Sequence, residues 1–107
     1  MPEPMDRRAA ERFPVNADTS CSFLAPVVED CRPAKIVNIS MEGIGLLVSR
    51  PVEPGSLLAV TLENRARGFS RTVLVRVVHA TPQLGSSLVG GRFCSPLPYQ
   101  ELTALVM

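Results

Sequence analysis

Residues 32–49 read RPAKIVNISMEGIGLLVS, and this stretch decides the predicted fold. Side chains in its first half alternate with a period of two residues, which is typical of a β-strand. One face of that strand would carry Ala34, Ile36 and Asn38, and the other face Lys35, Val37 and Ile39. Residues 40–43 predict a turn, because serine and glycine both favour turns. Residues 44–49 predict the returning strand, so the stretch forms two antiparallel strands.

Further β-strands are predicted at short, regular intervals on both sides of this hairpin. Each combines apolar or β-branched residues with flanking glycine, proline or polar residues. They cover residues 19–28, 56–62, 69–80 and 86–93. Because no helical pattern lies between them, they favour an antiparallel sandwich or a small barrel. Closure into a barrel removes most exposed strand edges, which a small all-β domain needs.

The two ends of the chain do not follow the β pattern. Residues 1–14 are rich in charge and proline and predict a flexible N-terminal arm, where a single helical turn would be marginal in water. Residues 98–107 predict a short helix, because Pro98 suits a first helical turn. The apolar residues of this helix share one face, which would cover the sheet: Leu102, Leu105 and Val106.

Length and composition are those of one folded domain. The 107 residues are 46% hydrophobic and 20% charged, which argues against disorder. We expect a single domain over residues 1–107, with the barrel over residues 15–95. The eleven basic and ten acidic residues nearly cancel, so a partner bound through bulk charge, such as duplex nucleic acid or an acidic membrane, is not expected. All the basic residues except Lys35 are arginines, whose forked donors suit individual phosphate or guanine contacts.

Residues for catalysis and metal binding are sparse. His79 is the one histidine, and it is far in sequence from Cys21, Cys31 and Cys94, so no metal site is predicted. We interpret His79 as an ordinary strand residue near a turn. No set of nucleophile, base and metal ligands is present, so we expect no catalytic residues and no enzyme. The odd cysteine number and the lack of a signal-peptide or membrane-spanning segment favour a cytoplasmic protein with reduced thiols.

Two short motifs carry residues suited to an anionic ligand. The first is Arg8 and Arg12, four residues apart and preceded by Arg7, in the predicted arm. Arginine forks match phosphate oxygens and the O6/N7 edge of guanine, so such an arm can wrap an anion. The second motif, residues 38–43, offers the amide of Asn38, the hydroxyl of Ser40 and the close approach that Gly43 permits.

Neither motif is specific by itself. Arg67 and Arg71 have the same spacing as Arg8 and Arg12 but fall in a predicted β-hairpin, where a solvated surface pair is the simpler interpretation. Asn38, Ser40 and Gly43 would also make a good turn without any ligand. The information lies in the combination of an arginine arm, one strand, and this turn between the second and third strands.

That combination resembles the PilZ domain family. The family has RxxxR in an N-terminal arm and (D/N)xSxxG after the second strand, which are matched here by RRAAERFPV and NISMEGIGL. Residues 89–93, VGGRF, resemble the final strand of the family. The resemblance extends from residue 6 to about residue 105.

The resemblance implies a six-stranded antiparallel β-barrel with a C-terminal helix, which binds the bacterial second messenger cyclic di-GMP. By position, Arg8 and Arg12 would grip phosphates and guanines, and Asn38, Ser40 and Gly43 would hold a guanine against the barrel. Arg7 before the motif implies an intercalated ligand dimer. Asn38 replaces the commoner Asp, which lowers the expected affinity. No other cofactor is implied.

A domain of this kind without an attached effector would relay its signal to a separate protein partner when the ligand orders the arm. Two alternatives remain open. One is a PilZ-like protein-interaction scaffold that does not bind the nucleotide. The other is a small nucleic-acid-binding barrel that uses an arginine cluster, although its five dispersed aromatic residues disfavour base stacking. The cluster comprises Arg65, Arg67, Arg71 and Arg76.

Overall fold

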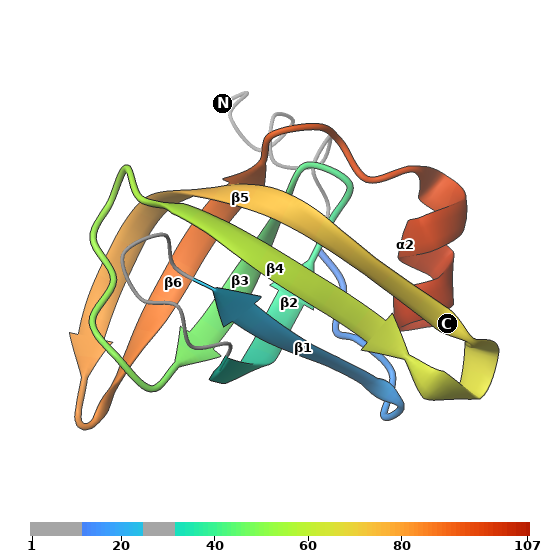
Figure 1. Ribbon diagram of the computed structural model, residues 1–107, viewed down its shortest axis with the longest axis horizontal. Helices are drawn as coiled ribbons and strands as arrows, with labels where there is room; N and C mark the ends of the chain where they lie inside the picture. The colour runs from blue at the N-terminus through green and yellow to red at the C-terminus, as the bar shows by residue number, and fades with distance from the viewer. Residues whose placement is uncertain (1–11, 25–31) are drawn as a thin grey trace, which may run out of the picture.

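The computed structural model describes residues 12–24 and 32–107. Six antiparallel strands close into a barrel in the order β1-β2-β3-β6-β5-β4, and a short helix, α2, lies at one end (Figure 1). The strands are β1 (Thr19–Leu24), β2 (Arg32–Ile39), β3 (Gly43–Val48), β4 (Leu57–Asn64), β5 (Phe69–Gln83) and β6 (Ser86–Phe93). A 3-10 turn, η1 (Arg65–Arg67), joins β4 to β5, and α2 spans Tyr99–Val106. The predicted barrel with a C-terminal helix is confirmed.

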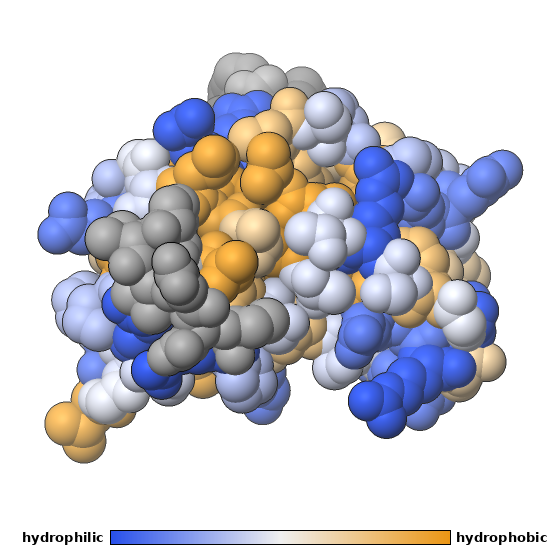
Figure 2. Space-filling model, viewed as in Figure 1, coloured by the Kyte–Doolittle hydropathy of each residue, from blue (hydrophilic) through white to orange (hydrophobic). Residues whose placement is uncertain are grey.

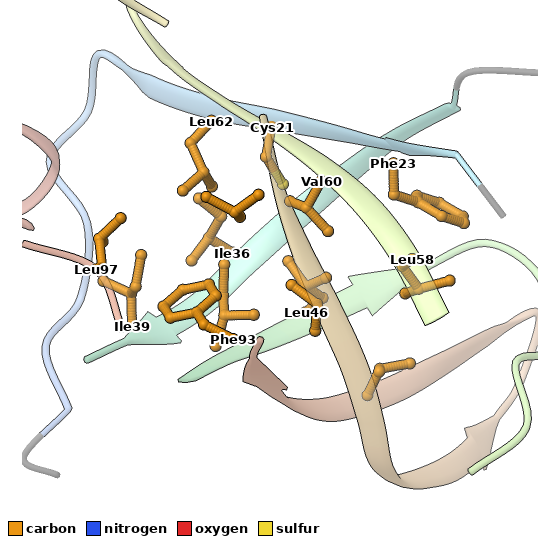
Figure 3. Packing of buried hydrophobic residues seen from close by; sticks show 14 of the residues in the cluster. Cys21, Phe23, Ile36, Ile39, Leu46, Leu58, Val60, Leu62, Phe93 and Leu97 are labelled. Atoms are coloured by element: carbon orange, nitrogen blue, oxygen red, sulfur yellow. The ribbon is translucent and has the colours of Figure 1, made fainter. Parts of the chain in front are cut away.

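The interior of the barrel is filled by alternate residues of every strand. In β4, for example, Leu58, Val60 and Leu62 are fully buried, whereas the residues between them are partly exposed. Side chains from all sides of the barrel meet in one continuous core (Figure 3). The strands therefore show the inward-outward alternation expected of a closed β-barrel.

The predicted alternation of β2 is wrong beyond Ile36. A β-bulge interrupts the pairing of β2 with β3 between Ile36 and Asn38, so that Val37 is an extra residue on the outside. As a result, Ile39 points into the core together with Ile36, although regular alternation would have put these two residues on opposite faces. Asn38 is turned outward, which places it at the surface of the barrel.

Several element boundaries also differ from the prediction, and β3, for example, spans Gly43–Val48 instead of residues 44–49. The fourth strand runs on to Asn64, beyond its predicted end at residue 62, and Gly68, the residue that follows η1, has a positive φ of 64°. The fifth strand extends to Gln83. For the first strand, residues 25–28 of the predicted range lie outside the described residues, as does most of the predicted arm.

Helix α2 closes one end of the barrel, beside the junction of β4 and β5 (Figure 1). Leu102 and Leu105 are buried, as the sequence pattern predicted. The carbonyl of Leu105 accepts hydrogen bonds from the backbone of Asn16 and the hydroxyl of Thr19, both at 2.9 Å. Because the last carbonyls of a helix have no partner within it, these bonds fix α2 to the chain just before β1.

Asn64 is the polar residue that joins these elements. It is only 1% exposed, and its Nδ2 lies 3.0 Å from Asn16 Oδ1 and 3.2 Å from the Ala104 carbonyl. Its Oδ1 accepts a hydrogen bond from the backbone of Arg67 in η1. A buried amide must have its hydrogen bonds satisfied, so Asn64 specifies how the strand, the turn and the helix meet.

Two of the three cysteines lie among the described residues, and both are free thiols. Cys94 is exposed, whereas Cys21 is buried and its Sγ donates to the carbonyl of Ala34. Burial raises the pKa of Cys21 to about 12, because a thiolate is poorly solvated in the core. Cys21 is therefore a protonated packing residue.

Among the described residues, no helix is long and apolar enough to cross a membrane.

One outer face of the barrel carries an apolar patch. In Figure 2, hydrophobic side chains gather over the strands that Figure 1 shows at the front. Leu24 of β1 pairs with Ala59 of β4, which in turn pairs with Leu74 of β5, and both leucines are exposed. The motif residues Asn38 of β2 and Gly43 of β3 belong to the other side of the barrel, because those strands follow β1 around its wall.

Leu105→Ala should destabilise the fold by about 2–5 kcal/mol, because it removes a fully buried side chain and leaves a cavity between α2 and the barrel. Urea unfolding followed by circular dichroism measures this change. Leu84→Ala is the matched control, because Leu84 is fully exposed in the β5–β6 turn and its loss should change stability by less than about 0.5 kcal/mol. Equal stability of the two variants would contradict the packing of α2.

Candidate functional site

The segment before β1 is bonded to the end of β2. Phe13 forms an isolated antiparallel bridge with Ile39, through backbone N–O distances of 2.8 and 2.9 Å. This bridge uses part of the edge of β2 that β1 leaves open, because β1 pairs only with residues 32–34. Phe13 and Val15 also pack against the core. The backbone of Arg12 is therefore held next to the end of β2.

Arg12 and Asn38 are in direct contact. Nη1 of Arg12 donates a hydrogen bond of 2.7 Å to Oδ1 of Asn38, across 26 residues of sequence. The bulge in β2 makes this contact possible, because it turns Asn38 outward. A guanidinium carries five N–H donors, so this one bond leaves donors for a ligand. Among the described residues, Arg12 has no acidic partner.

Gly45 of β3 lies in the candidate site, although neither sequence motif includes it. It pairs with Asn38, and a Cβ at Gly45 would lie 2.9 Å from Asn38 Oδ1 and 3.7 Å from Arg12 Nη1. The absence of a side chain therefore lets Asn38 lie across β3 with Arg12 beside it. The available signal was a glycine inside the apolar run IGLLV, since an isolated glycine in a strand often marks a close approach.

Asn38 and Gly45 begin a row of paired residues that continues across the next two strands, β6 and β5. Gly45 pairs with Gly90 of β6, and Gly90 pairs with His79 of β5. A Cβ at Gly90 would lie 2.3 Å from Nε2 of His79, so the imidazole lies across this glycine. A second bulge, between Val77 and His79, accompanies this arrangement. His79 is thus an exposed strand residue as interpreted, but it also borders the site.

We call the row Asn38, Gly45, Gly90 and His79 the polar platform. Its two outer side chains lie along the barrel surface over two central glycines instead of projecting from it. Arg12 stands at its β2 end. A shallow surface with amide and imidazole groups, bordered by a guanidinium, is chemically suited to a planar polar ligand that carries negative charge.

Ser40 and Gly43 shape the turn next to the platform. The buried Oγ of Ser40 accepts hydrogen bonds from the backbone N–H groups of Glu42 and Gly43, both at 3.1 Å. Gly43 is needed for the packing of β3 on β6, because a Cβ there would lie 2.3 Å from the carbonyl oxygen of Gly91. The structure therefore brings Arg12 and Asn38 together and directs the Ser40 side chain into the turn. Arg7 and Arg8 lie outside the described residues.

The second pair of arginines with the same spacing has a different environment. Arg71 forms an ion pair with Glu101 of α2, and Nη1 of Arg67 lies 3.5 Å from the carbonyl oxygen of Thr103. Both arginines are exposed, as predicted for a surface pair. Their contacts attach the β4–β5 connection to α2, which explains why equal spacing does not imply an equal role.

No group of three or more histidine, cysteine, aspartate or glutamate residues within the described ranges, 12–24 and 32–107, could hold a metal ion.

Ser40→Ala should lower the free energy of unfolding by about 1–3 kcal/mol, because it leaves two backbone N–H groups of the turn without their acceptor. Guanidinium unfolding of the two purified proteins gives the difference. Ser70→Ala is the control, since Ser70 is exposed on β5 and should change stability by less than about 0.5 kcal/mol. If Ser40→Ala were as stable as the control, the hydroxyl would not support the turn.

Comparison with known protein families gives one clear result. A family model for the PilZ domain matches residues 6–107. No curated protein matches the chain. PilZ domains are binding and adaptor modules rather than enzymes, and cyclic di-GMP is the ligand of the family. Because the match covers nearly the whole chain and includes every strand of the barrel and α2, this protein belongs to the PilZ domain family.

Proposed function

We propose that this protein is a receptor for cyclic di-GMP that passes the signal to an effector protein. The ligand-binding residues are those of the two motifs: Arg7, Arg8, Arg12, Asn38, Ser40 and Gly43. The observation that carries the proposal is the 2.7 Å bond from Arg12 to Asn38, which joins the two motifs of the family. Since cyclic di-GMP is a bacterial second messenger, the protein would act in the bacterial cytoplasm.

The chemistry of the platform supports a guanine ligand. Asn38 has an amide donor as well as the Oδ1 that Arg12 contacts, so it can pair with a base edge. The arginines of the arm would then bind the phosphates, because their forked donors match phosphate oxygens. Ser40 and Gly43 would contribute through the shape of the turn that they stabilise.

The affinity of the complex follows from opposing contributions. Each hydrogen bond to a charged group contributes about 1.5–3 kcal/mol, whereas ordering the arm costs a few kcal/mol. Asn38 is a neutral acceptor, which makes its contribution smaller than that of an aspartate. We therefore expect micromolar to sub-micromolar binding, about −8 to −9 kcal/mol.

Signal transfer would depend on the arm. Arg12 is held beside the barrel by the Phe13–Ile39 bridge, while Arg8 precedes it by four residues. Ligand bound between the platform and Arg8 would fix the arm over the barrel and create a new surface. An effector protein that recognises this surface would respond to the ligand, which is a disorder-to-order type of switch.

Arg12→Ala and Arg8→Ala should each weaken cyclic di-GMP binding by ~100-fold or more, because each removes two or more charge-assisted bonds. Isothermal titration calorimetry measures the affinity, with cyclic GMP and GTP as control ligands. Arg65→Ala is the matched protein control, because Arg65 is an exposed arginine in η1, the connection between β4 and β5, which contributes no residue to the platform. Unchanged affinity in either arm variant would refute the site, and no binding by the native protein would refute the function.

Arg7→Ala should change the stoichiometry from two cyclic di-GMP molecules to one, because we propose that Arg7 holds the second nucleotide of an intercalated dimer. Calorimetry under saturating conditions, supported by the mass of the complex in native mass spectrometry, gives the number of bound ligands. A native protein that saturates with one cyclic di-GMP would contradict the dimer while leaving the binding function intact.

A further inference from the structure

Arg92 of β6 lies next to the polar platform and has no role in either motif. Arg92 is exposed, and its pairing partner in β3 is Gly43. The next outward-facing pair of β3 and β6 is Gly45 with Gly90. Arg92 is two residues from Gly90 along β6, or roughly 7 Å at the rise of an antiparallel strand. Its side chain therefore leaves the barrel on the same outer face as Asn38 and His79.

The charge around Arg92 is unusual for a strand pair. Arg76 of β5 is directly opposite Arg92, and like charges in that position repel each other. Arg76 is directed away from the platform, because its Nη1 donates to the carbonyl of Gly55 beside β4 at 3.1 Å. Arg92 forms no hydrogen bond or ion pair with the described residues. Its positive charge is therefore not neutralised by the part of the chain that the structure describes.

The two residues paired with Arg92 differ in how they affect its side chain. Arg76 repels it on the β5 side, whereas Gly43 on the β3 side has no side chain. The open direction leads over Gly43 and β3, on the outer face of the barrel that also carries Asn38 and Gly45. Since Arg92 is two residues from Gly90, a ligand lying on the platform would have one guanidinium near β2, that of Arg12, and another near β6, that of Arg92.

We propose that Arg92 is a further ligand-binding residue, which donates to a phosphate of cyclic di-GMP on the polar platform. This inference rests on the proposed function and adds a contact from β6 that neither motif includes. A cyclic dinucleotide carries two phosphates, so a second guanidinium away from the arm has an anion to bind. Ligand binding would also relieve the repulsion between Arg92 and Arg76, because a phosphate placed beside Arg92 offsets one of the two positive charges.

The proposal is tested by calorimetric titration of cyclic di-GMP into the native protein and a set of arginine variants. Arg92→Gln should weaken binding by about 10- to 100-fold, the loss expected for charge-assisted hydrogen bonds, and Arg92→Lys should recover part of it by restoring the charge. Arg76→Gln is the matched control, because it removes the paired charge whose guanidinium is directed toward Gly55, and it should change affinity less than threefold. The melting temperature of Arg92→Gln should equal or exceed that of the native protein, because it removes the repulsion without removing a hydrogen bond to the described residues.

The outcomes separate the two levels of the proposal. Native binding with an unchanged affinity in Arg92→Gln overturns the role of Arg92 and leaves the proposed function standing. Equal losses in Arg92→Gln and Arg76→Gln also overturn it, because the effect would then be one of general charge. If the native protein does not bind cyclic di-GMP, the proposed function fails and the Arg92 assignment fails with it. This holds even when Arg92→Gln melts at the native temperature or above.

Discussion

The extra residue in β2, Val37, determines the direction of every side chain that follows it in that strand. Because of this bulge, Ile39 enters the core and Asn38 faces Arg12. A regular strand would bury the Asn38 amide among apolar residues and expose Ile39, and a buried amide without partners is costly. The same local irregularity thus satisfies the core and builds the site. Bulges are common next to functional sites for this reason, since they redirect side chains.

The second bulge, before His79 in β5, mirrors the first across the barrel wall. The two bulges lie on either side of the Gly45–Gly90 pair, and each turns a polar residue onto the outer face. Between them, the glycines allow those residues to lie along the surface. The platform therefore depends on the two bulged strands, β2 and β5, which flank the regularly paired strands β3 and β6. The residues of the NxSxxG motif have different roles. Asn38 lies at the surface, whereas Ser40 and Gly43 stabilise the turn between β2 and β3.

Local sequence information predicted the parts of this fold that local interactions control. The bounds of β2 and β6 follow from alternation and flanking turns, and α2 follows from its proline and apolar face. The bulges could not be predicted in this way, because they arise from pairing between strands that are distant in sequence. Asn64 was missed for a related reason. It looks like a loop residue, but tertiary contacts with Asn16 and Ala104 bury it at the end of β4. For the candidate site, the Asn38 motif and the arginine spacing could be recognised in the sequence. Gly45, Gly90 and Arg92 could not, because their relation to the site depends on pairing between strands.

The Phe13–Ile39 bridge has a consequence for the arginines that precede it. Since the chain is bonded to the barrel at Phe13, Arg8 is tethered four residues from a fixed Arg12, and an extended chain of that length spans at most about 14 Å. A group on so short a tether has a high effective concentration at the surface beside its attachment point, of the order of millimolar or above. Closure of the arm over a ligand, as proposed above, would then be an intramolecular event, with a rate and extent independent of protein concentration.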